Sequence, residues 1–250
     1  MLVDMSKVAW LSKAQIEQQA CSLLEEFSAT AGRKVTPPIP VEAMIELHFG
    51  ITLEYDDLEE SLGMPGVLGA TWVNEKRMVI NSSLLEGVEG RLVFTCGHEI
   101  GHWVLHRSYF FEQFSRSGSG ASANKDTPAI ICRTACSKLR GEWQADYFSG
   151  TLLIPEAEVK DAYVRAFGRE PLVLYNERSC FGRNSPVAFD PALDTVKEIA
   201  QKVIDQGGFT NVSREAMVYR LHELGLLVNA TGKKLINPSA SIAVCEPSLP

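Results

Sequence analysis

The chain has 250 residues, of which 45% are hydrophobic and 22% charged, a composition typical of a folded globular protein with a substantial core. Its 31 acidic and 24 basic residues give a net charge of -7. This charge disfavours nonspecific binding to nucleic acid or anionic membrane, because phosphate groups are bound mainly by clustered Lys and Arg. Six thinly spread cysteines, no signal-like N-terminus and no apolar run of about 18 residues predict a cytoplasmic protein without a membrane partner.

The first half of the chain alternates helical and strand patterns. Ser12 and Gln15 form a capping-box pattern before a helix that ends at Gly32. The patterns that follow predict a helix at 41–49, a strand at 51–55 and a hairpin of strands at 67–73 and 77–80. Two apolar helices are predicted next, at 91–106 and 141–153, with a loop of small polar residues at 115–126 between them. Together these elements predict an α+β domain with a small β-sheet.

The second half is simpler. Residues 168–189 show no clear periodicity, a helix is predicted at 191–205, and Ser213 begins a last helix that ends near Gly225. We therefore predict four parts: a domain at 1–167, a connection at 168–189, a helix-turn-helix-like segment at 190–228 and a C-terminal tail at 229–250.

Residues 98–102 read HEIGH, which matches the H-E-x-x-H signature of zinc peptidases on a helix. Side chains four residues apart share one helix face, so His98 and His102 can bind the same Zn²⁺. Glu99 lies beside them, where it can accept a proton from water activated by the metal. The alternative is a buried helix in which these His and Glu side chains only satisfy one another.

A catalytic zinc site usually has a third protein ligand. His106 is about 12 Å from His98 along the helix axis, too far to bind the same metal, and we expect it to interact with the carbonyl end of its helix. On the later helix, Glu142 and Asp146 share one face. Glu142 could bind the metal while Asp146 accepts a hydrogen bond from a ligand imidazole. On the residues alone, a solvated Glu142 is an equally open reading.

The two helices resemble those of the ImmA/IrrE family of HExxH metallopeptidases. Residues 94–106, FTCGHEIGHWVLH, and 142–155, EWQADYFSGTLLIP, follow the family patterns FTxAHExGHxxLH and ExxA(N/D)xFAxxLLMP. The predicted hairpin and the downstream VSREAMVYRLHELGL extend the resemblance over most of residues 41–227. Gly97, Ser149 and Ile154 stand where the family has Ala, Ala and Met.

The resemblance implies a zincin-like metallopeptidase domain followed by the helix-turn-helix-like segment. It implies that His98, His102 and Glu142 bind Zn²⁺, that Glu99 is the catalytic base, and that Asp146 supports a metal ligand. It also implies a zinc-dependent endopeptidase that cleaves a protein substrate, a DNA-binding repressor of stress-response or mobile-element genes. The alternative function is a non-proteolytic, zinc-containing regulatory or adaptor protein that acts by binding protein or DNA.

Direct DNA binding is disfavoured by the charge of the C-terminal segment. Residues 190–228 contain four basic and six acidic residues, a net charge of -2. A segment with this charge is a poor match for a phosphate backbone. We expect it to pack against the catalytic domain or to contact a protein substrate.

Cys132 and Cys136 are spaced as a metal-binding or redox pair could be. A structural zinc site needs a second pair of Cys or His residues nearby, and the sequence offers none there. We therefore interpret them as buried or idle thiols.

Overall fold

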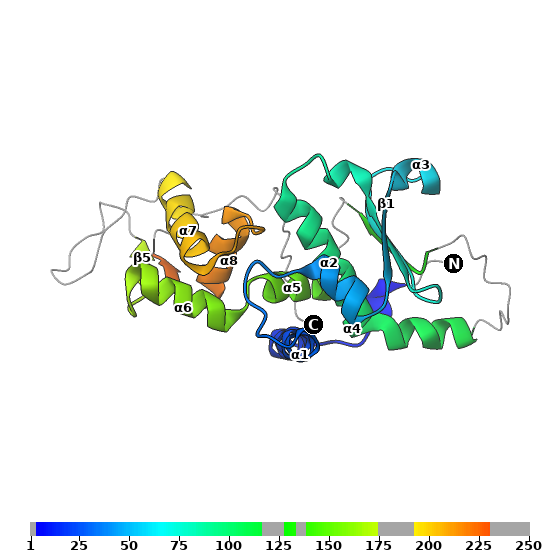
Figure 1. Cartoon of the computed structure of the whole chain (residues 1–250), viewed down its shortest axis with the longest axis horizontal. Helices are drawn as coiled ribbons and strands as arrows, with labels where there is room; N and C mark the ends of the chain where they lie inside the picture. The colour runs from blue at the N-terminus through cyan, green and yellow to red at the C-terminus, as the bar shows by residue number, and fades with distance from the viewer. Residues whose placement is uncertain (1–3, 117–127, 134–138, 175–192, 231–250) are drawn as a thin grey trace. The chain divides into compact units, whose positions relative to one another are not determined.

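A computed structural model describes residues 4–116, 128–133, 139–174 and 193–230 of the chain. The predicted loop at 115–126 falls largely outside these residues, as do most of the predicted connection and the tail from residue 231. The described part is a mixed α+β structure with eight α-helices and a small sheet (Figure 1). None of its helices is both long and apolar enough to cross a bilayer.

Two compact units divide the described residues, and each is considered by itself. Residues 4–35 and 40–152 form the first unit, and 36–39 and 153–230 form the second. The elements of the first unit are η1 (Met5–Lys7), α1 (Lys13–Ala31), α2 (Val41–Ala43), the π-helical turn η2 (Met44–His48), β1 (Thr52–Asp56), α3 (Leu58–Leu62), β2 (Val67–Trp72), β3 (Arg77–Asn81), η3 (Ser82–Leu84), α4 (Glu89–Arg116), β4 (Ile130–Arg133) and α5 (Arg140–Leu153).

The sheet of the first unit has four strands in the order β1-β3-β2-β4. β1 runs parallel to β3, while β2 is antiparallel to both β3 and β4. The hairpin of β2 and β3 confirms the sequence prediction. β4 was not predicted: it is a four-residue strand in which the apolar positions show no alternation. As an edge strand next to β2, it extends the sheet over residues of α4.

The two faces of β2 have different roles, because successive side chains of a strand point to opposite faces. Ala70 and Trp72 join Leu58 and Val79 in an apolar cluster beneath α3. Thr71, on the opposite face, points to α4 and hydrogen-bonds its residue Glu99. Helix α4 packs on this face of the sheet (Figure 1). One strand thus supplies a hydrophobic core on one side and a polar contact on the other.

Local signals explain where the helices begin and end. The Ser12 capping box starts α1, and Gly32 ends it with φ +65, a left-handed conformation that costs glycine little. Both features confirm the sequence prediction. Helix α4 continues to Arg116, beyond the predicted end at His106, because apolar side chains such as the buried Phe110 continue its inward face.

The second unit contains α6 (Glu156–Phe167), β5 (Leu172–Leu174), α7 (Leu193–Gly207), α8 (Arg214–Glu223) and β6 (Leu227–Asn229). α6 packs on α7, and α7 on α8. The compact units divide at the end of α5, because α6 shares its core with the later helices, while the domain boundary at residue 167 stays a prediction. β5 pairs in parallel with β6 and lies in the segment predicted to be an irregular connection.

Candidate metal centre

The candidate site is built where α4 and α5 cross at very short distance. A Cβ atom at Gly101 would lie only 3.0 Å from the Cα of Ala145. Glycine on one helix and alanine on the other let the two backbones approach closely. Glu142 is nearly one turn before Ala145 on α5, so this crossing brings its carboxylate to the two histidines of α4.

Three side chains converge at the crossing. The Nε2 atoms of His98 and His102 are 2.9 Å apart. Glu142 places one carboxylate oxygen 3.3 Å from Nε2 of His98 and the other 3.6 Å from Nε2 of His102. One donor atom from each residue lies within 4.8 Å of the others, and both histidines are buried. His98, His102 and Glu142 are therefore close enough to hold a metal ion.

The chemistry of the donors fits a divalent metal. Burial alone would raise the pKa of Glu142, but the neighbouring His102 and His98 lower it well below the usual value. The carboxyl group is thus ionised at neutral pH and can bind a cation. Two imidazole nitrogens and one carboxylate form a donor set that is common in catalytic zinc sites.

Asp146 contacts the other ring nitrogen of His98. Its Oδ1 lies 2.8 Å from Nδ1 of His98, one helical turn after Glu142 on the same face of α5. A carboxylate can only accept here, so the Nδ1–H of His98 donates and its Nε2 faces the other two donors. The sequence analysis placed Asp146 in this role, and the structure brings the two side chains together.

Glu99 lies between the two histidines in sequence and is completely buried. Its Oε2 accepts a hydrogen bond of 2.6 Å from the hydroxyl of Thr71 on β2, while its Oε1 has no hydrogen-bond partner among the described residues. Burial raises the pKa of the Glu99 carboxyl. A Cβ atom at Gly69 would lie 2.8 Å from Oε1, so glycine at this position of β2 leaves room for the carboxylate.

The surroundings of His106 differ from those predicted. It lies inside α4 rather than at its end, and it is buried. Its Nδ1 is 3.0 Å from Nδ1 of His102, and its Nε2 is 2.8 Å from the side-chain oxygen of Gln144 on α5. Burial, followed by the neighbouring His102, lowers the pKa of His106 to about 3. The predicted contact with the helix carbonyl end is wrong, because α4 is longer than its motif suggested.

Sequence reasoning missed two residues of the site, Thr71 and Gln144, and gave Cys132 no role there. The Cys132 side chain is buried on β4; burial raises the pKa of its thiol, and the neighbouring His98 acts to lower it. It is thus a buried thiol, as predicted, but it lies at the metal centre; Cys136 falls outside the described residues. Its spacing from Cys136 was noted in the sequence, but its position beside His98 was not predicted, because the strand that carries it was not recognised.

A comparison with known protein families and with curated proteins finds no match to this chain. The resemblance to the ImmA/IrrE metallopeptidases therefore rests on the motifs of α4 and α5. The geometry of the crossing is an independent observation, since it depends on the positions of the side chains and not on a family pattern.

Proposed function

We propose that the chain is a zinc-dependent metallo-endopeptidase of zincin-like fold, related to the ImmA/IrrE family. One observation carries the proposal: the donors of His98, His102 and Glu142 converge while Glu99, in the same buried cluster, keeps a carboxylate oxygen without a hydrogen-bond partner among the described residues. A purely structural metal site usually has four protein ligands, whereas three donors of the described residues converge here beside a buried carboxylate oxygen that has no partner among them.

The side chains of the crossing match the needs of peptide hydrolysis. Bound Zn²⁺ would supply Lewis acidity toward a peptide carbonyl and toward water. Glu99 would accept a proton from the attacking water and return it to the leaving amine as the C–N bond breaks. Its buried position raises its proton affinity, and Thr71 holds its second oxygen in place. Asp146 would keep His98 in the tautomer that can bind metal.

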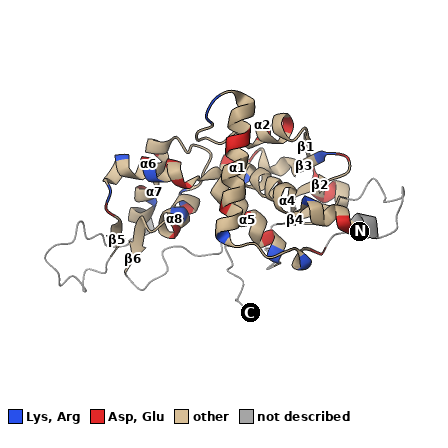
Figure 2. Cartoon of the chain, turned by 90° about the horizontal axis from the view of Figure 1, so that it is seen from below, with Lys and Arg blue, Asp and Glu red and all other residues tan. Residues whose placement is uncertain are grey.

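The charge distribution of the second unit disfavours direct binding to DNA. Lys197 on α7 pairs with Glu215 at 3.0 Å, and the buried Arg220 pairs with Glu223 at 2.9 Å. Figure 2 shows acidic and basic residues on the same helices of this unit, not a face of one sign. Within the family, the implied substrate is a DNA-binding repressor in the cytoplasm, and we propose the same class here.

The test is cleavage of a purified repressor encoded next to the gene of this protein by the zinc-loaded chain. Glu99→Gln should bind zinc normally and lower the cleavage rate by about 10²- to 10⁴-fold, the usual contribution of a general base. Glu86→Gln, a matched change at an exposed site, should leave the rate unchanged. If no repressor is cut while a partner binds equally to the Glu99→Gln and unaltered chains, the protein is an adaptor.

A further inference from the structure

A chain of hydrogen bonds runs from His102 away from the converging donors. Nδ1 of His102 lies 3.0 Å from Nδ1 of His106, and Nε2 of His106 lies 2.8 Å from Oε1 of Gln144. Gln144 Nε2 in turn donates to the backbone carbonyl of Ala9 at 3.0 Å. The three side chains are at most 2% exposed, so water cannot readily replace any of these contacts.

The carbonyl of Ala9 fixes the direction of every bond in this chain. A carbonyl oxygen only accepts, so the amide nitrogen of Gln144 must face it and the amide oxygen must face His106. That oxygen also only accepts, so Nε2 of His106 carries a proton and donates. The Nδ1 of a neutral His106 then has a lone pair and accepts from Nδ1–H of His102. His102 is left with a bare Nε2 that lies 2.9 Å from the bare Nε2 of His98, a contact that is favourable when a cation is bound by both nitrogens.

The other tautomer of His102 does not fit. With its proton on Nε2, His102 would place the lone pair of Nδ1 against the lone pair of His106 Nδ1, two buried acceptors 3.0 Å apart without a donor. Such a pair is unfavourable in a buried site, where neither atom can turn to water. The same tautomer would also point a proton at the position where a metal must bind.

The segment that contains Ala9 is held on α5 by further contacts. Arg140 donates to the carbonyl of Val8 at 3.0 Å, and the ring of Trp10 stacks on Trp143 with centroids 5.5 Å apart. Contacts on both sides of Ala9 thus keep its carbonyl in place. The end of the hydrogen-bond chain is a backbone group, which cannot change its donor or acceptor character.

We propose that His106 and Gln144 are positioning residues that hold His102 in the tautomer with a proton on Nδ1 and a bare Nε2 for the metal. His98 and His102 then receive the same orientation by different means, His98 from the carboxylate of Asp146 and His102 from a neutral chain anchored at Ala9. The inference rests on metal binding, the first part of the proposed function, and does not depend on peptide hydrolysis.

The test measures zinc dissociation constants by chelator competition in the full-length chain. His106→Leu removes the acceptor for His102 and should raise the Kd by about 10- to 100-fold, as the loss of a partner of a metal ligand usually does. His106→Asn can place its amide oxygen near the position of Nδ1 and should stay within about three-fold of the unaltered chain. His106→Gln reaches toward Gln144 but lacks that acceptor, so its Kd should resemble that of the Leu variant.

Two-bond ¹H–¹⁵N spectra of the unaltered zinc-loaded chain report the tautomers without any substitution. We expect a proton on Nδ1 of His102 and on Nε2 of His106. A proton on Nδ1 of His106, or equal Kd values for the Leu, Gln and Asn variants, would overturn the inference. A lower melting temperature with an unchanged Kd would show that His106 only packs. A chain that binds zinc but cuts no protein contradicts the peptidase proposal, while the Kd series still decides this inference.

Discussion

Two helix pairs of this protein bury polar groups in different ways. At the crossing of α4 and α5, side chains hydrogen-bond one another, and three donor atoms face a common point. Between α7 and α8 the buried side chains are mostly apolar, and the buried Arg220 donates to the backbone carbonyl of Ile154 and pairs with Glu223. The difference between the two pairs is that only the crossing of α4 and α5, among the described residues, brings three possible metal donors together.

The largest effect is expected when one carboxylate is removed from each helix pair and the zinc affinities are compared. Glu142→Ala deletes a metal donor, and its effect on zinc Kd should exceed the roughly 10- to 100-fold change expected for loss of a supporting residue. Glu215→Ala removes the partner of Lys197 in the second unit and should leave the Kd unchanged. Metal analysis after dialysis against a weak chelator measures both.

Undiminished zinc content in Glu142→Ala would exclude Glu142 from the ligand set. An equal loss of zinc in Glu215→Ala would show that the second unit also contributes to the site, and the contrast between the two pairs would fail.

A second prediction concerns the close packing that creates the crossing. A Cβ atom at Gly97 would lie 2.5 Å from Oγ of Ser149, which donates to the carbonyl of Phe94. Gly97→Ala alone should therefore lower the free energy of unfolding by about 1 to 3 kcal/mol through overpacking. With Ser149→Ala in addition, the obstructing hydroxyl is gone and most of the loss should be recovered. Urea unfolding of all four members of the double-mutant cycle measures the coupling.

An additive cycle would show that α4 and α5 are farther apart than this structure places them. Coupling between the two positions would also explain at once why the chain differs at Gly97 and Ser149 from the pattern that it resembles, which has alanine at both. Two replacements that look unrelated in the sequence are in contact across the helix crossing.

The sequence was informative where a signal is local. The capping box at Ser12 and the hairpin depend on residue spacing over a short stretch of sequence. The pairing of HEIGH with Glu142 was implied by the resemblance of both helices to family motifs. The strand β4 and the roles of Cys132 and Gln144 at the site were not predicted, because they depend on which elements become neighbours in space. His106 was misplaced because a motif ended there while the helix did not.

The pH dependence of the free energy of unfolding tests the buried polar groups of the α4–α5 crossing, here through His106. The folded chain lowers the pKa of His106 to about 3 from 6.5. As the pH falls below about 6.5, the unfolded chain takes up a proton that the folded chain does not, so acidification favours unfolding. From about pH 7 to pH 5, this residue should remove about 2 kcal/mol from the free energy of unfolding of the metal-free protein.

Urea unfolding at the two pH values tests this expectation, with His106→Asn as the reference that lacks the imidazole. The difference between the two chains isolates His106 from groups common to both, including Glu142 and His98. A loss of stability that is equal in both chains would mean that His106 is not held neutral by its buried surroundings.

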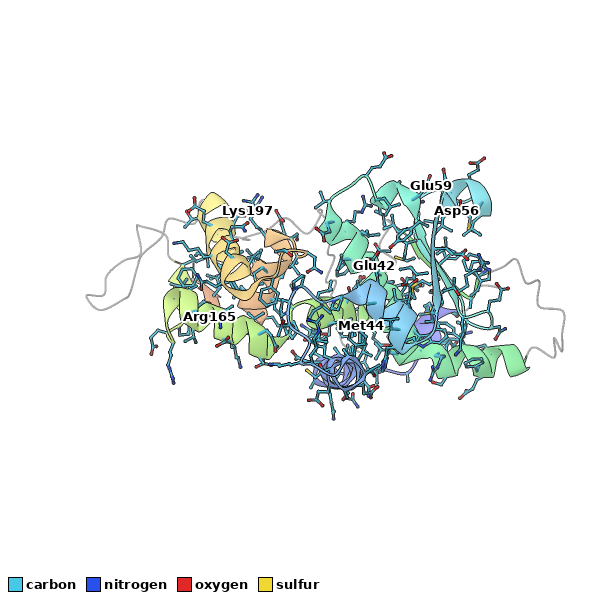
Figure 3. All side chains as sticks on the ribbon, viewed as in Figure 1. Glu42, Met44, Asp56, Glu59, Arg165 and Lys197 are labelled. Atoms are coloured by element: carbon cyan, nitrogen blue, oxygen red, sulfur yellow. The ribbon has the colours of Figure 1, made fainter. Side chains whose placement is uncertain are left out.

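The smallest effect is expected in the second unit, at the ion pair of Lys197 and Glu215. Lys197 lies on α7 (Figure 3), and both side chains are about one third exposed, at 30% and 31%. A pair in partly solvated surroundings contributes about 0 to 1 kcal/mol and is weakened by salt. Lys197→Ala should therefore lower the free energy of unfolding by at most about 1 kcal/mol, less in high salt, and should leave the zinc Kd unchanged. A larger, salt-independent loss would show that this pair is part of the core of its unit.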